Sequence, residues 1–454
     1  MFPAELAWGS QSAVFKHGTI QWVMNGYGQV PFPPPTSTLA ARMPAVIRRA
    51  LFATTFLCST LLWDVHGNEV TGPSPPLPIA AGKEITANLV NMIFWFDRVA
   101  SDPPRATTAN YLARVSNPSS PLYPSYLEYK RGNIDRHELE DRLPHVAMLG
   151  DSLTQHFYFS SLPSSFWRAR TEWRRNWFLD TDPSPDSIFS VYERLEYFTP
   201  VVATEFNGAG ALVTAPASQE DLRERLVRTR NLPGQVNHVL HRTRFPDLIM
   251  IWIGHNNLDW VQGLSSEERQ HPQQRLRALA AQVRVNYTES LQGLIDRAKR
   301  ENHRVAIVVF GLANIDRYLK GRRQAEILHT ENPKLYPHFD SGTRSFESLQ
   351  PPYQQNMARL AVLINTGLRA MVADLERELS NAHHVRIEYS DALTKIDFNH
   401  LELINTVDGW HPSIEGHKVL AQAAFNALRR SLVFLGIGTT TKKKAPLLAS
   451  SQPQ

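Results

Sequence analysis

Short apolar runs alternate with longer amphipathic stretches along most of the chain, from about residue 145 onward. Four apolar runs, as expected of strands buried on both faces, cover residues 145–149, 201–206, 247–253 and 304–310, and a weaker fifth covers 385–389. Helical spacing of apolar positions occurs at residues 218–231, 265–301, 353–380 and 413–430. This alternation predicts an α/β fold, a three-layer α/β/α domain with a central parallel five-stranded sheet.

In such a sheet, ligands bind beyond the carboxyl ends of the strands, so the residues that follow each strand are the first candidates for a site. Ser152 follows the first run in Gly150-Asp151-Ser152, where a tight strand-to-helix turn can expose a nucleophilic hydroxyl and an oxyanion-binding N–H. Asn256 follows the third run in Gly254-His255-Asn256-Asn257 and offers a neutral amide donor. Each segment alone is also a common turn sequence.

A third candidate segment, Asp408-Gly409-Trp410-His411-Pro412-Ser413, precedes the last predicted helix. An aspartate three residues before a histidine can orient the imidazole through one ring nitrogen. The other nitrogen is then available to take a proton from a serine. Considered alone, this segment is equally typical of a surface loop.

Together the three segments resemble the SGNH (GDSL) hydrolase family, most specifically in VAMLGDSLT, IWIGHNN and DGWHPSIEGH. The resemblance covers about residues 145–430 and is nearest to the lipase, esterase and phospholipase-B-like members. It implies the flavodoxin-like SGNH hydrolase fold, Ser152 as the catalytic nucleophile, and His411 as general base and then acid. Asp408 would orient His411.

The resemblance also implies an oxyanion hole formed by the Ser152 N–H, a glycine N–H from a second block, and the Asn256 side chain. The second block follows the second run, in EFNGAGA at residues 205–211. Strand register favours Gly210 as the donor, and Gly208 is the alternative.

Two residues depart from the family pattern. Glu205 stands where the family usually has asparagine, and Asn257 stands where many members carry aspartate. We expect catalysis to survive the second change, because asparagine can still accept and donate hydrogen bonds. His255 and His417 are expected to be structural or solvent-facing.

The sequence predicts no cofactor and no metal. The 17 histidines show no His-Glu-x-x-His spacing, and NGAGA lacks the Lys-Ser/Thr of a phosphate-binding loop. The formal net charge of +5 comes largely from the two ends of the chain, so bulk charge gives no support to a nucleic-acid partner. We expect a small-molecule, glycan or lipid ester as substrate, with contact to a membrane surface as an open option.

The first part of the chain has a different character. Arg48 and Arg49 precede an apolar stretch at 50–63, which is the layout of a secretory signal peptide, although 42 residues come before Met43. We expect residues 1–42 to be a misassigned extension, 43–66 to be a signal peptide, and the protein to be secreted or periplasmic. A membrane-anchoring helix and a core helix are the alternatives for this stretch.

The remaining boundaries follow from composition. Residues 67–144 are expected to form a linker and a helical extension, 145–436 the hydrolase domain, and 437–454 a disordered tail. The single cysteine, Cys58, excludes a disulfide scaffold.

These observations predict a serine hydrolase that cleaves a lipid, lysophospholipid or acetylated-glycan ester through an acyl-enzyme intermediate. Two alternatives stay open: an O-acyltransferase acting on sugar hydroxyls, and a non-catalytic carbohydrate- or lipid-binding module.

Overall fold

The computed structural model describes residues 105–155, 175–181, 188–208, 210–213, 231–334, 351–405 and 411–437, together with the backbone of four further strands. The chain divides into two compact units, Met1–Ala81 and Gly82–Gln454. In the first unit, β1 (Ser12–Lys16) and β2 (Thr19–Val23) form an antiparallel pair. The expected signal segment, the expected linker, the expected tail beyond residue 437 and all but the last residue of the helix predicted at 218–231 lie outside the described residues.

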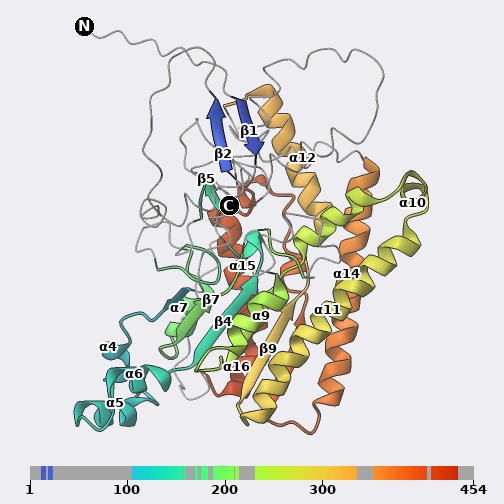
Figure 1. Ribbon diagram of the computed structural model, residues 1–454. Helices are drawn as coiled ribbons and strands as arrows, with labels where there is room; N and C mark the ends of the chain where they lie inside the picture. The colour runs from blue at the N-terminus through green and yellow to red at the C-terminus, as the bar shows by residue number, and fades with distance from the viewer. Residues whose placement is uncertain are drawn as a thin grey trace, which may run out of the picture. The chain divides into compact units, whose positions relative to one another are not determined.

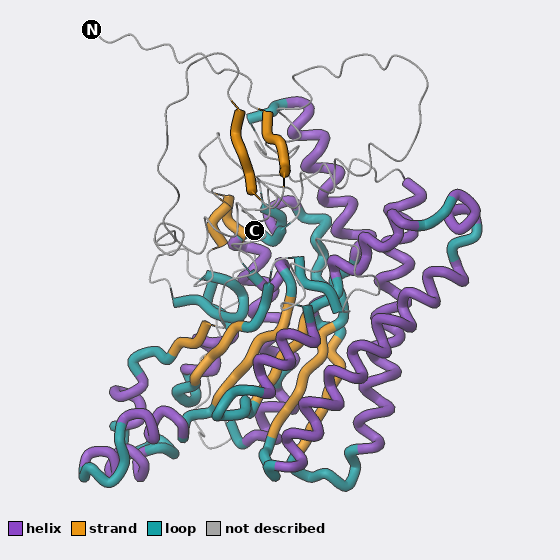
Figure 2. The backbone as a smooth tube through the Cα atoms, viewed as in Figure 1, coloured by secondary structure: helices purple, strands orange, loops and turns teal. Residues whose placement is uncertain are grey.

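The second unit is built around a six-stranded sheet with the strand order β10-β9-β8-β4-β7-β3. Figure 2 draws the strands in orange. Its strands are β3 (Arg105–Thr107), β4 (His145–Gly150), β7 (Val202–Glu205), β8 (Leu248–Trp252), β9 (Val305–Phe310) and β10 (Val385–Ser390). The five predicted strands are parallel, and β3 adds an antiparallel sixth at the β7 edge. All five expected parallel strands are present; β3 was not expected, because it spans only three residues and no apolar run marks it.

Burial explains why the central strands are continuous apolar runs. Every residue of β4, β7, β8 and β9 is buried, whereas β10 at the sheet edge is buried only in part. Parallel sheets are normally covered on both faces, so their strands need apolar side chains on both sides. One continuous hydrophobic core accordingly includes residues from these strands and from the helices on both faces.

Helices cover both faces of the sheet (Figure 1). On one face, α9 (Leu232–Leu240), α11 (Gln273–Arg300) and α14 (Pro351–Glu378) pack side by side. On the other face lie α7 (Val191–Glu196), α15 (Ile414–Ala427) and α16 (Arg429–Leu435). This arrangement confirms the predicted three-layer α/β/α fold.

Several helix boundaries differ from the sequence-based expectation. The helix predicted at 265–301 is two helices, α10 (Ser266–Gln270) and α11, separated at His271 and Pro272 because proline lacks the N–H that would continue the first helix. The helix predicted at 413–430 is likewise divided into α15 and α16 at Leu428. Three of the described helices after β4 were not predicted: α7, α9, and α12 (Ile315–Glu331), which packs against α14.

The segment before β4 contains three short helices, α4 (Tyr111–Val115), α5 (Tyr123–Lys130) and α6 (Arg136–Asp141). They share a small hydrophobic cluster that reaches the sheet at Val202. Helix α6 begins with a capping box, in which the Asp135 side chain accepts a hydrogen bond from the Glu138 N–H.

The remaining elements are short. The strands β5 (Phe157–Phe159) and β6 (Ala169–Thr171) form an antiparallel pair. Short 3₁₀ helices are η1 (Ser152–Thr154), η4 (His255–Gly263), η5 (Leu393–Lys395) and η6 (Leu401–Leu403). Within the part of the chain that the structure describes, no helix has the length and apolar content needed to span a bilayer.

Candidate active site

Ser152 lies in a sharp turn at the carboxyl end of β4. The turn is closed by the Thr154 N–H and hydroxyl, which both donate to the Asp151 carbonyl oxygen at 3.2 and 2.7 Å. Gly150 is required just before it, because a Cβ at this position would lie 2.3 Å from Thr154 Cγ2. The helix expected after the turn is only the three residues of η1. Ser152 is 9% exposed.

The backbone of Gly150, just before this turn, is fixed by hydrogen bonds to α9 and to the loop after β7. Gln235 of α9 receives a hydrogen bond from the Gly150 N–H at 2.8 Å and donates one to the Gly150 carbonyl oxygen at 2.7 Å. The same carbonyl accepts the Gly208 N–H at 3.1 Å. Gln235 belongs to no sequence motif, so nothing in the sequence pointed to this role.

The two glycines of the second block have different environments. The Gly208 N–H is occupied by the Gly150 carbonyl, whereas no described residue accepts a hydrogen bond from the Gly210 N–H. Gly208 also accepts the Ala211 N–H at 3.2 Å, which closes a turn in which Gly210 has φ +71°, in the left-handed region that favours glycine. The geometry therefore leaves Gly210 as the candidate donor to a ligand.

The loop after β8 is bonded directly to this glycine turn. The Asn256 amide nitrogen donates to the Ala211 carbonyl oxygen at 2.9 Å, and the Asn257 side-chain oxygen accepts the Val213 N–H at 2.9 Å. Gly254, at φ +124°, has a backbone conformation that side-chain-bearing residues rarely adopt. Three of the predicted segments, around Ser152, Gly210 and Asn256, thus meet at the carboxyl ends of β4, β7 and β8.

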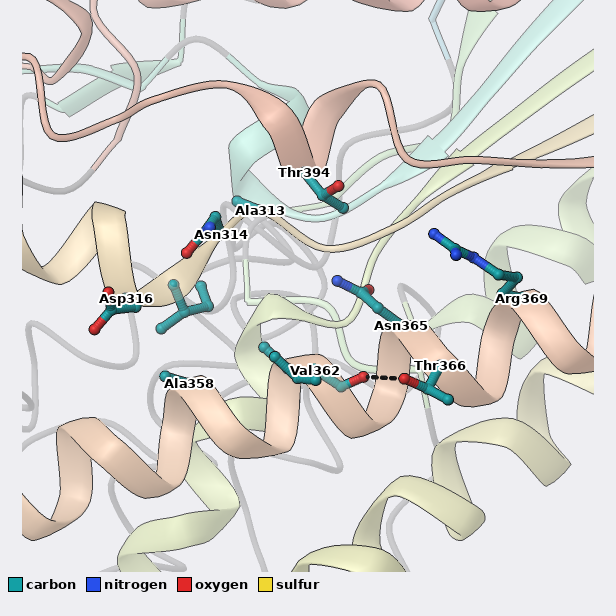
Figure 3. Close-up of a pocket in the computed structure, with 11 residues that line it drawn as sticks. Ala313, Asn314, Asp316, Ala358, Val362, Asn365, Thr366, Arg369 and Thr394 are labelled. Carbon is teal, nitrogen blue, oxygen red and sulfur yellow. Dashed lines mark hydrogen bonds between the residues drawn. The ribbon is translucent and has the colours of Figure 1, made fainter.

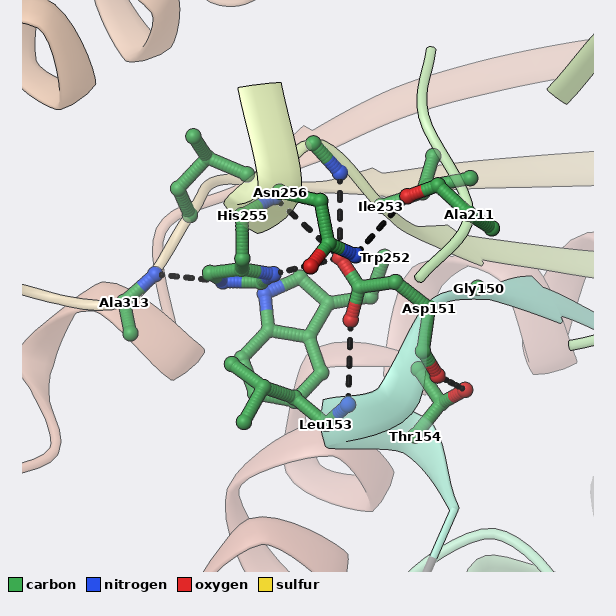
Figure 4. Close-up of polar contacts among 12 residues, drawn as sticks. Gly150, Asp151, Leu153, Thr154, Ala211, Trp252, Ile253, His255, Asn256 and Ala313 are labelled. Atoms are coloured by element: carbon green, nitrogen blue, oxygen red, sulfur yellow. Dashed lines mark hydrogen bonds and ion pairs between the residues drawn. The ribbon is translucent and has the colours of Figure 1, made fainter. Parts of the chain in front are cut away.

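Asp151, which is fully buried, is the centre of the polar contacts at the carboxyl ends of β4 and β8 (Figure 4). Its Oδ1 accepts the Leu153 N–H at 3.0 Å. Its Oδ2 accepts the N–H groups of Gly254 and His255, both at 3.1 Å, and lies 2.8 Å from His255 Nδ1. The Ser152 turn and the Asn256 loop are therefore joined through one carboxylate.

Two further buried side chains hold the Asn256 loop. His255 is buried rather than solvent-facing, and its Nε2 accepts the Ala313 N–H at 3.2 Å. The Tyr287 hydroxyl of α11 donates to the Ile253 carbonyl oxygen at 2.8 Å. Burial raises the pKa of Tyr287, and the nearby negative charge of Asp151 raises it further, so this hydroxyl remains a donor.

The loop that carries His411 is fastened to the preceding segment, at residues 401–405. The Asn405 N–H donates to the His411 carbonyl oxygen at 2.7 Å, and the Ser413 N–H donates to the Leu403 carbonyl oxygen at 3.0 Å. Ser413 also caps α15 by accepting the Gly416 N–H at 3.0 Å. Asp408 lies outside the described residues, so its pairing with His411 stays a prediction.

Helix α15 is connected to the core beneath the carboxyl ends of the strands. Its His417, fully buried, accepts the Trp177 N–H at Nδ1 over 3.3 Å. The Trp177 ring packs edge-on against Trp252 and Phe310, the last residues of β8 and β9, with centroid distances of 5.9 and 6.3 Å. The helix that follows His411 is therefore anchored beside the strands whose ends carry the candidate site.

A cavity of about 350 Å³ lies next to this region, between the start of α12, the middle of α14 and Thr394 (Figure 3). Its polar side chains already have protein partners: Asn365 bonds to the Leu312 backbone, Thr394 to the Asp391 carbonyl oxygen and Arg369 to the Asp391 carboxylate. We assign it no catalytic group. Across the ranges that the structure describes, no cluster of histidine, cysteine and acidic residues is arranged to hold a metal ion.

The chain is similar to one known protein family and to several solved structures. The family described as GDSL-like lipase/acylhydrolase matches residues 146–424. Similar solved structures include the lipase Lip_vut3 from a goat rumen metagenome, at 14% identity and a TM-score of 0.30, covering 65% of this chain and 99% of that one. A mutant of the esterase AlinE4 is 15% identical with a TM-score of 0.25, covering 64% of this chain and 97% of that one. No curated protein matches the chain.

Proposed function

Because the chain belongs to the GDSL-like lipase/acylhydrolase family, we propose that it is a serine hydrolase that cleaves carboxylic esters through an acyl-enzyme intermediate. One structural observation carries the proposal. Direct hydrogen bonds join the Ser152 turn, the Gly208–Ala211 turn and the Asn256 loop at the carboxyl edge of the sheet. Nucleophile and oxyanion donors must be held in such a fixed arrangement for acyl transfer.

In the first step, Ser152 Oγ attacks the ester carbonyl carbon while His411 removes the hydroxyl proton. The oxyanion that forms is stabilised by the N–H groups of Ser152 and Gly210 and by the Asn256 amide. One hydrogen of that amide is used by the Ala211 carbonyl, and the second remains for the oxyanion. His411 then protonates the leaving alkoxide, and the alcohol departs.

In the second step, His411 takes a proton from water, and the resulting hydroxide attacks the acyl-enzyme carbonyl. Collapse of the second tetrahedral intermediate releases the carboxylic acid and returns the proton to Ser152. Asp408 orients the imidazole and stabilises its charged form in both steps. No cofactor takes part in this mechanism.

Replacing the nucleophile tests the proposal. Ser152→Ala should abolish hydrolysis of a short p-nitrophenyl ester and labelling by a fluorophosphonate probe, while the circular dichroism spectrum stays that of the wild type. Ser431→Ala is the matched control, because Ser431 is also buried but lies in α16. Wild-type turnover by Ser152→Ala, or an unreactive wild-type protein, would refute the proposal.

The substrate class requires a separate assay. We propose that the ester is a lipid, a lysophospholipid or an acetylated glycan, in keeping with the family to which the chain belongs. A panel of acyl chain lengths and acetylated oligosaccharides, followed by product analysis, ranks these classes. Net ester formation on a sugar acceptor would identify an acyltransferase instead.

A further inference from the structure

His255 joins the candidate site to a loop that lies outside all the motif segments. Its Nδ1 is 2.8 Å from Asp151 Oδ2, and its Nε2 is 3.2 Å from the backbone nitrogen of Ala313, in the loop after β9 (Figure 4). The loops that follow β4, β8 and β9 are therefore connected through one imidazole.

The backbone partner determines which ring nitrogen carries the proton. An amide N–H can only donate, so His255 Nε2 must present its lone pair to Ala313. The proton then lies on Nδ1, which donates it to the Asp151 carboxylate. The ring is held as the neutral Nδ1–H tautomer, and its edge-on packing against Trp252, at a centroid distance of 4.8 Å, fixes its plane.

We propose that His255 is a positioning residue for ester hydrolysis, acting through Asp151 and the backbone of residues 254–256 on the Ser152 turn and the Asn256 amide. This inference rests on the proposed function, and His255 itself contacts no substrate. Its role is to keep the nucleophile and the oxyanion donors at a constant separation.

The contacts explain why loss of the imidazole would disturb the site. Asp151 Oδ2 would keep only its two backbone donors, and the Ala313 N–H would lose its acceptor. The Ala313 N–H is buried, and a buried polar group without a partner is costly, so the loop is expected to rearrange. A displacement of about 1 Å in a catalytic group can reduce the rate about 100-fold.

Two substitutions remove the two hydrogen bonds of His255 one at a time. In His255→Asn, the side-chain amide can replace the Nδ1–H donor to Asp151 but cannot reach Ala313. In His255→Gln, the carbonyl oxygen can replace Nε2 as acceptor, while the donor to Asp151 is lost. His145→Gln is the matched control, because His145 is also a buried histidine but lies at the amino end of β4, at the other end of this strand from the Ser152 turn.

We expect His255→Gln to lower kcat for a p-nitrophenyl ester by about 10- to 100-fold with little change in KM. His255→Asn should lower kcat by a smaller factor than His255→Gln does. His145→Gln should keep the wild-type kcat. Wild-type kcat in both His255 variants, an equal loss in the His145 control, or a kcat for His255→Gln at or above that of His255→Asn would overturn the positioning role.

A spectroscopic measurement tests the bridge independently of activity. Two-bond ¹H–¹⁵N correlation spectra of histidine-labelled protein, assigned with the His255→Gln variant, should show the neutral Nδ1–H tautomer at pH 7.5. An Nε2–H tautomer or an imidazolium would overturn the inference. If the wild-type protein neither hydrolyses esters nor reacts with the fluorophosphonate probe, the proposed function fails, while this spectrum still decides whether the bridge exists.

Discussion

Replacing Gly416 by alanine should displace the helix that follows His411. A Cβ on Gly416 would lie 2.2 Å from the Leu403 carbonyl oxygen and 3.1 Å from Pro412 Cβ. The same carbonyl accepts the Ser413 N–H, a bond that holds the His411 loop to the preceding segment. Leu403 therefore cannot move aside without loosening that loop, and α15 is expected to move instead.

The size of the effect follows from this overlap. Ordinary carbon–oxygen contacts are no closer than about 3.3 Å, so α15 and Leu403 must separate by about 1 Å. Overpacking of this kind costs about 1–3 kcal/mol, whereas alanine favours the helix by about 1 kcal/mol relative to glycine. The net loss of stability should be about 0–2 kcal/mol. A shift of about 1 Å in the general base, in contrast, can lower kcat up to about 100-fold.

Gly367→Ala is the matched control. Gly367 lies inside α14, where the nearest atom to a new Cβ is Arg284 Cβ at 4.0 Å. This variant should gain about 0.5–1 kcal/mol of stability and keep the wild-type kcat. Urea unfolding and p-nitrophenyl ester kinetics, measured on both variants in one buffer, give the two quantities.

The result that would refute this reasoning is specific. If Gly416→Ala gained as much stability as Gly367→Ala and kept the wild-type kcat, the contact with Leu403 would not constrain α15. A loss of stability with an unchanged kcat would show that α15 does not position His411.

Two further predictions concern His145, at the amino end of β4, and Asn256, a proposed oxyanion donor. Burial, aided by the positive charge of Arg244, lowers the pKa of His145, so the unfolded chain binds more protons than the folded one just below the ordinary pKa. Stability should therefore fall as the pH drops below about 6.5, the ordinary pKa of histidine, and His145→Gln should flatten this dependence in urea titrations; equal slopes would contradict it. Asn256→Ala should lower kcat about 100- to 1,000-fold with little change in KM, and wild-type kcat would exclude Asn256 from the oxyanion hole.

The central strands were predictable because a strand buried on both faces must be apolar throughout. β8 and β9 meet this condition at every position. The edge strand β3 does not, because its pairing with β7 depends on backbone groups that every residue carries. Helix α12 was missed for a related reason: it is mostly polar and contains Gly321, which approaches the Phe398 backbone closely.

Candidate site residues were predictable where they follow strands. Ser152 and Asn256 come directly after neighbouring strands, so their proximity follows from the parallel order of β4 and β8. Gln235 and Tyr287 lie within helices, and only three-dimensional packing shows that they bond to the backbone beside those residues. For His255, the signal was its place between the glycine and the asparagine of one motif, but its bond to Asp151 spans two loops that are distant in sequence.

The two halves of the candidate site are anchored to different parts of the fold. Ser152, Gly210 and Asn256 are held by loops of the sheet, through the buried Asp151 carboxylate and backbone hydrogen bonds. His411 is held by the segment at 401–405 and by α15, whose tie to the sheet runs through His417 and Trp177. Loops are usually among the least stable parts of a protein, so each half needs its own buried contacts. A change in α15 can therefore move His411 while the hydrogen bonds around Ser152 and Asn256 remain intact.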